Sequence, residues 1–434
     1  MFFMPFNILG MWFRGLLAVA ILAGGVYLLN RWYDDAHVVE RIPTSRRADG
    51  ATVETVANRR VFRFDPGWNR PTLELGAALA LLIWGTAGGA IGHGLSRLTL
   101  RRGAPSGATD ARDARARGGA ATIGPEADVD PSGDRTGESH TIRRPDGTEL
   151  RVECHGRRDA PPIVFSHGWG VDSTAWFYQK RYLAERFRVI IWDEPGLGLS
   201  TQPANKDYRL EKFAADLDAV LALADGRPAV LVGHSIGGMA TLTYCKEHPE
   251  ALGARVAGVV LVHTTYTNPV RTTQMAALYT ALEEPVIVPL LYLTIGLWPL
   301  AWALNWLSYL NGTVHRSTHR SSFAGGETRG QLDFFAEFMP RARPDVLARG
   351  MLGMLAYDAT EALPRINVPT LVVVGDLDTT TKPEAGEFIA GQVPGGRLAT
   401  LSPARHLGLV EHHGEFDRLL AEFAEECQPA EIEG

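Results

Sequence analysis

This chain of 434 residues has few cysteines and no excess of basic over acidic residues. Its three cysteines, Cys154, Cys245 and Cys427, are widely spaced and odd in number, which fits neither a disulfide framework nor a zinc cluster. The formal net charge of -6 leaves no overall basic field, so we expect no nucleic-acid partner. Apolar residues make up 45% of the chain, a share that excludes a disordered protein and supports a core of ordinary size.

Long apolar runs occur twice near the N-terminus. The first, over residues 12–30, is interrupted only by Arg14, and the second, over residues 73–95, contains the uncharged stretch LGAALALLIWGTAGGAIG. Each approaches the roughly 20 residues that a helix needs to span a bilayer. We therefore predict two transmembrane helices, at 12–30 and 73–95, within a membrane anchor over residues 1–102. A cleaved signal peptide is the alternative for the first run, but its positively charged start and its small-residue cleavage site are poorly formed.

Flanking arginines bear on the orientation of this multi-pass anchor. Three of them follow the second run closely and favour a C-terminal domain on the cytoplasmic side: Arg97, Arg101 and Arg102. Others precede the run, so the positive-inside rule gives no clean answer: Arg59, Arg60, Arg63 and Arg70. The glycines of GTAGGAIG suit a face on which helices pack closely.

Residues 103–140 are rich in Gly, Ala, Pro, Asp and Arg and almost lack large apolar side chains. Such a segment cannot bury enough surface to offset the entropy lost on ordering, so we predict a flexible linker. A docking patch built from its alternating Arg and Asp is the alternative.

After the linker, short apolar runs alternate with amphipathic stretches. Runs that are apolar throughout and rich in β-branched residues suit strands buried on both faces of a parallel sheet. The alternation predicts an α/β fold. The runs lie at 149–155, 161–167, 187–193, 228–234, 256–263 and 369–376.

The stretch Gly233-His234-Ser235-Ile236-Gly237 lies where one of these strands meets a helical pattern. This is the context of a nucleophile elbow, a tight strand-to-helix turn that exposes a serine. Glycine at 233 and 237 removes side chains that would collide with neighbouring backbone, and the helix N-terminus faces developing negative charge. A GxSxG motif alone is weak evidence in a glycine-rich chain, and an ordinary glycine turn is the alternative.

A serine hydroxyl needs a base, usually a histidine oriented by a carboxylate. His406 follows the last predicted strand, whereas His412 and His413 fall in the next helix and are interpreted as surface residues. Asp376 and Asp378 both follow a strand, and the spacing favours Asp378 as the acid, with Asp376 fixing the loop. Serine, acid and histidine then occur in the chain order that the elbow motif leads us to expect.

An oxyanion formed during acyl transfer needs hydrogen-bond donors. The strand at 161–167 ends at His167-Gly168, which places the backbone N–H of Trp169 to act together with that of Ile236. A simple turn at His167-Gly168 is the alternative.

Five motifs resemble those of α/β-hydrolase-fold proteins: SHGWG, DEPGLGLS, GHSIGG, GDLDTTTKP and ARHLGLVEH. The resemblance implies a hydrolase domain over 141–427, with a mostly parallel sheet flanked by helices and a helical cap insertion. It also implies a serine esterase or lipase that requires no metal or organic cofactor. Epoxide hydrolases and haloalkane dehalogenases share the fold but use an aspartate at the elbow, so Ser235 argues against both chemistries.

The expected cap spans residues 267–364 and contains an uncharged stretch at 285–314 that is rich in Leu and Trp. One interpretation is a buried cap core whose helices are broken by Pro289 and Pro299. The other, which we favour, is a lid that dips into the membrane interface and is anchored by three tryptophans on one helical face: Trp298, Trp302 and Trp306.

Together these features predict a membrane-anchored serine hydrolase that cleaves lipophilic or lipid esters through an acyl-enzyme. Its partners are then the ester substrate and the lipid bilayer. Haloperoxidase-like chemistry or carbon–carbon bond hydrolysis by the same triad is an alternative within enzymology. A catalytically silent membrane scaffold is the alternative outside it.

Overall fold

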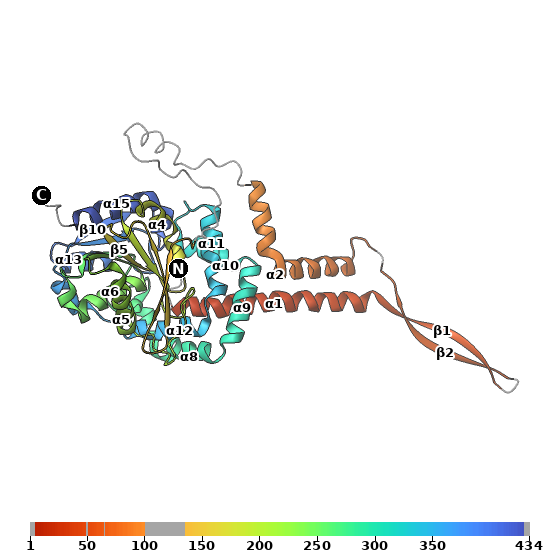
Figure 1. Cartoon of the computed structure of the whole chain (residues 1–434). Helices are drawn as coiled ribbons and strands as arrows, with labels where there is room; N and C mark the ends of the chain where they lie inside the picture. The colour runs from red at the N-terminus through yellow and green to blue at the C-terminus, as the bar shows by residue number, and fades with distance from the viewer. Residues whose placement is uncertain (1–4, 49–50, 65, 100–134, 429–434) are drawn as a thin grey trace. The chain divides into compact units, whose positions relative to one another are not determined.

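The computed structural model describes residues 5–48, 51–64, 66–99 and 135–428, and it divides into two compact units (Figure 1). The first unit comprises residues 1–12, 102–305 and 314–434. The second comprises residues 13–101 and 306–313.

The first unit contains an eight-stranded sheet with the strand order β10-β9-β8-β7-β5-β6-β4-β3. The β3–β4 and β4–β6 pairs are antiparallel, and the remaining neighbours are parallel. The strands are β3 Glu138–Arg143, β4 Glu149–His155, β5 Pro162–Ser166, β6 Arg188–Trp192, β7 Ala229–His234, β8 Val256–Val262, β9 Thr370–Gly375 and β10 Arg397–Leu401.

Burial along the central strands explains why the sequence reads as continuous apolar runs. Every residue of β5, β6, β7 and β9 is buried. Strands covered by helices on both faces need apolar side chains at successive positions rather than at alternate ones. The predicted fold class, a mostly parallel sheet flanked by helices, is confirmed.

Helices connect the strands of the sheet. α4 packs against α15, and α5 packs against α6. The elements are the short 3-10 helix η4 Ser173–Trp176, followed by α4 Phe177–Leu183, α5 Leu210–Leu221, α6 Ile236–Glu247, α13 Pro383–Gln392, α14 Gly408–Glu411 and α15 His413–Glu426.

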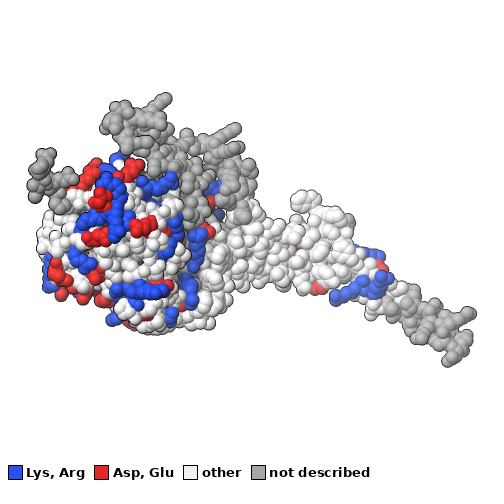
Figure 2. All heavy atoms as spheres, in the orientation of Figure 1, with Lys and Arg blue, Asp and Glu red and all other residues white. Residues whose placement is uncertain are grey.

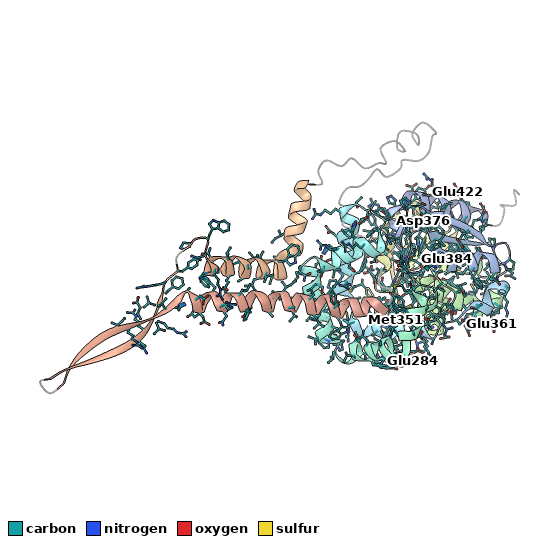
Figure 3. All side chains as sticks on the ribbon, turned by 180° about the vertical axis from the view of Figure 1, so that it is seen from behind. Glu284, Met351, Glu361, Asp376, Glu384 and Glu422 are labelled. Carbon is teal, nitrogen blue, oxygen red and sulfur yellow. The ribbon has the colours of Figure 1, made fainter. Side chains whose placement is uncertain are left out.

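The segment between β8 and β9 is helical. It consists of α7 Ala276–Leu282, the π-helical turn η8 Glu283–Ile287, α8 Val288–Gly296, α9 Trp298–Leu310, α10 Thr313–Ser322, α11 Arg329–Arg341 and α12 Pro344–Leu355. Leu291 and Ala301 are fully buried, as is Met351 of α12, which is labelled in Figure 3. These helices therefore share one hydrophobic cluster with the strands of the sheet.

The tryptophans of α9 have different surroundings. The guanidinium carbon of Arg343 lies 4.0 Å from the ring centroid of Trp298. Trp302 donates its indole N–H to the carbonyl oxygen of Pro340 at 2.6 Å. Trp302 and Trp306 remain 38% and 40% exposed. The uncharged stretch thus contains both buried and exposed apolar side chains, and a lid in the membrane interface stays a prediction.

Strand β3 begins three residues inside the segment that was predicted as a linker. Residues 138–140 pair with β4, so the linker prediction was too long at its C-terminal end. Edge-strand pairing stabilises these residues even though few of them are apolar. The part of the predicted linker from 103 to 134 lies outside the described residues.

The second unit is built around two long helices, α1 Pro5–Asp35 and α2 Arg70–Thr99, although the first eight residues of α1 belong to the first unit. Glycines let the helices approach closely. A Cβ atom at Gly25 would lie 2.8 Å from Cγ of Leu82, and one at Gly85 would lie 2.6 Å from Cδ2 of Leu22. Small residues at such contacts are typical of helices that pack in membranes.

Between these helices the chain forms a β-hairpin that the sequence analysis did not predict. Its strands, β1 His37–Ala48 and β2 Ala51–Phe62, pair antiparallel from one end to the other. An ion pair joins the two helices, with Glu74 of α2 lying 3.2 Å from Arg31 of α1. Glu74 also contacts Arg70 of its own helix at 2.9 Å.

Three helical stretches of the described chain are long and apolar enough to cross a membrane: Gly10–Asp35, Arg70–Gly89 and Ala276–Gly296. The first two are the stretches predicted as transmembrane helices, here with different bounds, and the third belongs to α7, η8 and α8. On the face drawn in Figure 2, the atoms of α1 and α2 form a surface with very few charged groups.

Candidate active site

Ser235 occupies the turn between β7 and α6. Its backbone has a φ of 59°, a left-handed conformation that is strained for a residue with a side chain. A Cβ atom at Gly233 would lie 2.5 Å from the carbonyl oxygen of Gly237, and one at Gly237 would overlap the carbonyl oxygen of Ser166. The two glycines are therefore required by the tightness of the turn, as the sequence pattern indicated.

The structure brings Ser235, His406 and Asp378 into one line of contacts. Oγ of Ser235 lies 2.9 Å from Nε2 of His406, and Nδ1 of His406 lies 2.8 Å from Oδ2 of Asp378. Ser235 and His406 are 0% exposed, and Asp378 is 3% exposed. These three residues thus have the distances of a hydrogen-bonded nucleophile, base and acid.

Burial shapes the electrostatics of this site. It lowers the pKa of His406 to about 4, so the imidazole is neutral at pH 7 and able to accept a proton. Burial alone would raise the pKa of Asp378, but the contacts with His406 and His263 outweigh it and hold that pKa well below its usual value. The site therefore contains a neutral imidazole beside an ionised carboxylate.

Backbone and hydroxyl groups fix the Asp378 carboxylate. Oδ1 accepts hydrogen bonds from the N–H groups of Thr380 at 2.7 Å and Thr381 at 3.2 Å. The Thr381 hydroxyl donates to Oδ2 at 3.0 Å. These contacts leave Oδ2 facing the imidazole of His406.

The neighbouring carboxylate, Asp376, faces a different group. Its Oδ1 accepts from the N–H of Ala404 at 2.9 Å, and its Oδ2 accepts from the hydroxyl of Ser402 at 2.7 Å. These contacts hold the loop that precedes His406. Asp376 thus holds the loop before His406, the role predicted for it from the sequence.

The other two histidines considered as bases lie away from Ser235. His412 contacts the carbonyl oxygen of Pro403 at 2.7 Å through Nε2. The ring of His413 stacks on Tyr178 with centroids 3.9 Å apart. Both are half-buried rather than fully exposed, because α15 packs against α4.

The proposed oxyanion donors lie on the two segments that flank Ser235. Ile236 is the first residue of α6, and Trp169 follows the end of β5. Trp169 is 2% exposed, and its indole N–H donates to the carbonyl oxygen of Leu347 in α12 at 3.1 Å. The cap thereby holds the side chain of the residue whose amide is a candidate donor.

Two further histidines, missed in the sequence analysis, lie in this site. His234 contacts the carbonyl oxygen of His406 through Nε2 at 3.1 Å. His263, which follows β8, places Nδ1 3.4 Å from Oδ2 of Asp378. Both are buried, so the acid and base of the site are surrounded by other imidazoles.

Within the described residues, no group of three or more His, Cys, Asp or Glu side chains has a geometry that could hold a metal ion.

Residues 161–413 match the family model of the alpha/beta hydrolase fold, and the chain belongs to this family. The match covers more than half of the chain and contains Ser235, Asp378 and His406.

Proteins similar to this chain include enzymes with different activities. A pimeloyl-[acyl-carrier protein] methyl ester esterase of Nitrosospira multiformis is 28% identical over 280 residues, covering 63% of this chain and 98% of the relative. A non-heme chloroperoxidase of Streptomyces lividans is 37% identical over 123 residues, covering 28% of this chain and 43% of the relative. Among solved structures, an esterase from Exiguobacterium antarcticum aligns with a TM-score of 0.55 at 24% identity, covering 66% of this chain and all of the other. The relatives support an α/β-hydrolase enzyme, and the esterase among them acts on a small-molecule ester.

Proposed function

We propose that this protein is a membrane-anchored serine hydrolase that cleaves lipophilic carboxylic esters. The observation that carries the proposal is the contact of Ser235 Oγ with Nε2 of a neutral, buried His406 at 2.9 Å. A serine hydroxyl becomes a useful nucleophile only when such a base can take its proton.

In the acylation step, His406 accepts the Ser235 proton while Oγ attacks the ester carbonyl carbon. The Nδ1–H of His406 donates to Asp378, which stabilises the imidazolium and fixes the tautomer. The tetrahedral oxyanion accepts hydrogen bonds from the N–H groups of Trp169 and Ile236, and the latter lies at the N-terminus of α6. His406 then returns the proton to the alcohol as the ester bond breaks.

Deacylation repeats these roles with water as the nucleophile. His406 takes a proton from water, the resulting hydroxide attacks the acyl carbonyl carbon, and collapse of the second tetrahedral intermediate releases the acid and regenerates the Ser235 hydroxyl. The same two backbone donors serve both steps.

Apolar side chains of α8 and α9 support a lipophilic substrate class. Seven large apolar residues of this stretch are exposed, a density that suits contact with lipid or with long acyl chains. They are Tyr292, Leu293, Leu297, Leu300, Trp302, Trp306 and Leu310.

The start of α1 also supports substrate access from the bilayer. Met11 is 3% exposed and belongs to the same hydrophobic cluster as Ile287 and Leu291 of the cap. The indole N–H of Trp12 donates to the hydroxyl of Thr294 at 3.1 Å. Met11 and Trp12 of α1 therefore contact the cap.

Labelling with a fluorophosphonate probe tests the serine chemistry. The full chain should be labelled covalently, and the Ser235→Ala variant should not be. Equal labelling of both, or of neither, would show that Ser235 is not an activated nucleophile and would favour the silent scaffold.

A series of p-nitrophenyl esters from acetate to palmitate, presented in liposomes, tests the substrate class. We expect kcat/KM to rise with acyl length, because each added methylene buried in an apolar site contributes about 0.8 kcal/mol. A preference for acetate would leave the serine hydrolase intact and reject the lipophilic substrate class.

The chloroperoxidase relatives favour one second candidate, in which hydrogen peroxide rather than water attacks the acyl-enzyme and releases a peracid. Halogenation of a dye in the presence of acetate, peroxide and bromide measures this activity. We expect it to be weaker than ester hydrolysis, and the reverse order would make peracid formation the main reaction.

The orientation of the anchor is also proposed, with the hydrolase unit on the cytoplasmic side. Glu422 is exposed on α15 (Figure 3), whereas Cys154 and Cys245 are buried and Cys427 is half-buried. A Glu422→Cys variant should react with a membrane-impermeant maleimide only after the cells are permeabilised, with the parent chain as background. Labelling in intact cells would reverse the orientation.

A further inference from the structure

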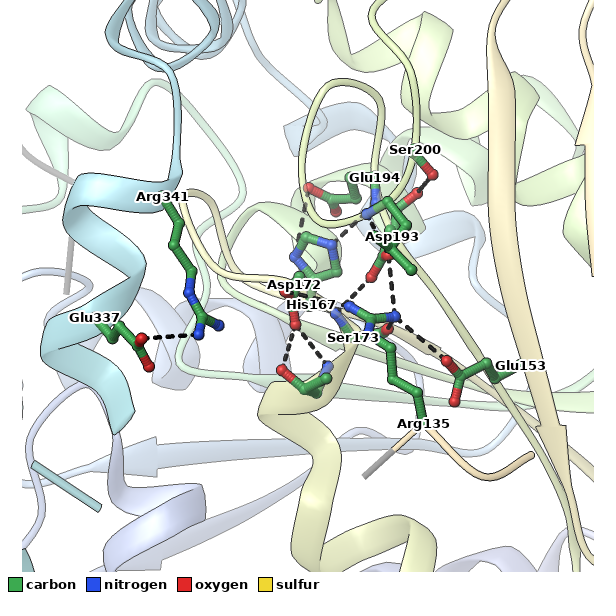
Figure 4. A network of polar contacts seen from close by, with 12 residues as sticks. Arg135, Glu153, His167, Asp172, Ser173, Asp193, Glu194, Ser200, Glu337 and Arg341 are labelled. Carbon is green, nitrogen blue, oxygen red and sulfur yellow. Dashed lines mark hydrogen bonds and ion pairs between the residues drawn. The ribbon is translucent and has the colours of Figure 1, made fainter. Parts of the chain in front are cut away.

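A cluster of charged side chains lies beside the oxyanion loop, which we define as residues 167–173. Arg135 is the centre of this cluster and contacts carboxylates from three separate elements (Figure 4). Its Nη1 atom lies 3.3 Å from Glu153 of β4 and 3.2 Å from Asp193, which follows β6. Its Nη2 atom lies 3.2 Å from Asp172 of the oxyanion loop. Arg135 precedes the family match at 161–413, so a residue outside the matched domain supplies this cation.

Two of these carboxylates hold the end of the oxyanion loop in place. Asp172 Oδ1 accepts from the N–H of Thr174 at 2.9 Å and thereby caps η4. Asp193 Oδ1 accepts from the N–H of Ser173 at 2.8 Å. Trp169, whose N–H is a proposed oxyanion donor, lies three residues before Asp172. The position of that donor therefore depends on where Asp172 and Asp193 lie.

These two carboxylates repel each other unless a cation lies between them. Asp172 is 8% exposed, and Asp193 and Glu153 are 0% and 1% exposed. Burial and the charge of Asp193 raise the pKa of Asp172, and Arg135 opposes that shift. Like charges buried together are costly unless a third group compensates them. The guanidinium group contacts all three carboxylates and is suited to this role, because its planar fork offers several donors.

We propose that Arg135 is a positioning residue for the oxyanion loop. It draws Asp172 and Asp193 together and so fixes the backbone from which the Trp169 N–H projects. The inference rests on the proposed function. It adds that Arg135, which precedes the hydrolase domain in the chain, helps to place the Trp169 N–H for the oxyanion. Arg135 itself does not touch the substrate or the reacting atoms.

Kinetics of the full chain on p-nitrophenyl butyrate test the proposal. Arg135→Met should lower kcat by about tenfold and leave KM within about twofold, because a displaced oxyanion donor weakens the transition state rather than substrate binding. Arg135→Lys should lower kcat by less than Arg135→Met does, because lysine keeps the positive charge but lacks the planar guanidinium group. Arg143→Met, which removes an exposed ion pair with Glu149 on the neighbouring strand, is the matched control and should leave kcat unchanged.

A second substitution separates charge compensation from simple packing. Asp172→Asn keeps an oxygen that can cap η4 but removes one of the repelling charges. The Arg135→Met/Asp172→Asn double variant should therefore recover kcat to within about threefold of the parent. A loss of melting temperature without a loss of kcat in Arg135→Met, or no recovery in the double variant, would overturn the proposal.

Fluorophosphonate labelling of the same preparations distinguishes this failure from failure of the proposed function. Absence of labelling in the parent chain would reject the serine hydrolase and the role of Arg135 together. Labelling at the parent rate in Arg135→Met, with Ser235→Ala unlabelled, would reject the role of Arg135 alone.

Discussion

The Nδ1 atom of His263 lies 3.4 Å from Oδ2 of Asp378, the same carboxylate oxygen that faces Nδ1 of His406 at 2.8 Å. The imidazole of His263 lies against Gly375, where an added Cβ atom would come within 2.8 Å of its Cε1 atom. One carboxylate oxygen is thus shared by two buried rings, of which the sequence predicts only His406 as a partner of Asp378.

Replacing His263 by Phe should lower kcat by less than about tenfold with KM unchanged. A hydrogen bond to a charged group is worth about 1.5 kcal/mol, and the contact of His263 with Asp378, at 3.4 Å, is longer than such a bond. The ring volume is kept, so the fold should persist. Steady-state kinetics and the rate of fluorophosphonate labelling measure the effect. Labelling at the parent rate would mean that His263 only fills space.

Substitution of the two aspartates should give very different losses. Asp378→Asn should reduce kcat by about 10⁴-fold, since the acid of a triad fixes the histidine tautomer and stabilises its charge. Asp376→Asn should cost less than about tenfold in kcat and about 1 kcal/mol in the free energy of unfolding, because an amide keeps one acceptor for the N–H of Ala404. Kinetics and chemical denaturation of both variants check this, and similar kcat losses would contradict the assignment of Asp378.

The pH dependence of kcat/KM follows from the lowered pKa of His406. The base must be neutral to accept the serine proton, so kcat/KM should stay level from pH 8 down to about pH 6. It should then decrease by half near pH 4, where the pKa of His406 lies. Circular dichroism at each pH shows whether the fold persists. A midpoint near pH 7 would indicate that the base is less desolvated than the structure indicates.

Close packing of the two long helices gives a prediction for the second unit. Gly85→Val should lower the melting temperature in detergent micelles, because its Cβ atom would lie 2.6 Å from a methyl group of Leu22. Gly76→Val is the matched control on the same helix, since a Cβ atom at Gly76 meets nothing within 4 Å. Equal melting temperatures for the two variants would show that α1 and α2 do not pack as described.

The sheet and the elbow could be predicted because their signals are local. Six buried strands appear as short apolar runs, and the glycines around Ser235 are dictated by a turn of five residues. Asp378 and His406 could be named because each follows a predicted strand. Because the strands of a parallel sheet end on the same side, residues that follow them are expected to lie together.

Other features depend on contacts that the sequence does not display. His263 ends an ordinary apolar strand, and only the position of β8 between β7 and β9 brings it to Asp378. Arg135 lies in a segment whose composition is that of a linker. The β1–β2 hairpin did have a local signal, an Asp-Gly pair at 49–50 between two stretches of similar length, but its strands are too polar to be noticed among apolar runs.

The hydrogen bond between Trp12 and Thr294 joins residues 282 positions apart. At a synthesis rate of about 5–20 residues per second, a ribosome needs roughly 14 to 56 s to pass from one to the other. Trp12 therefore leaves the ribosome long before its partner in the cap has been synthesised. The hydrogen bond between Trp12 and Thr294 can therefore form only late in the synthesis of the protein.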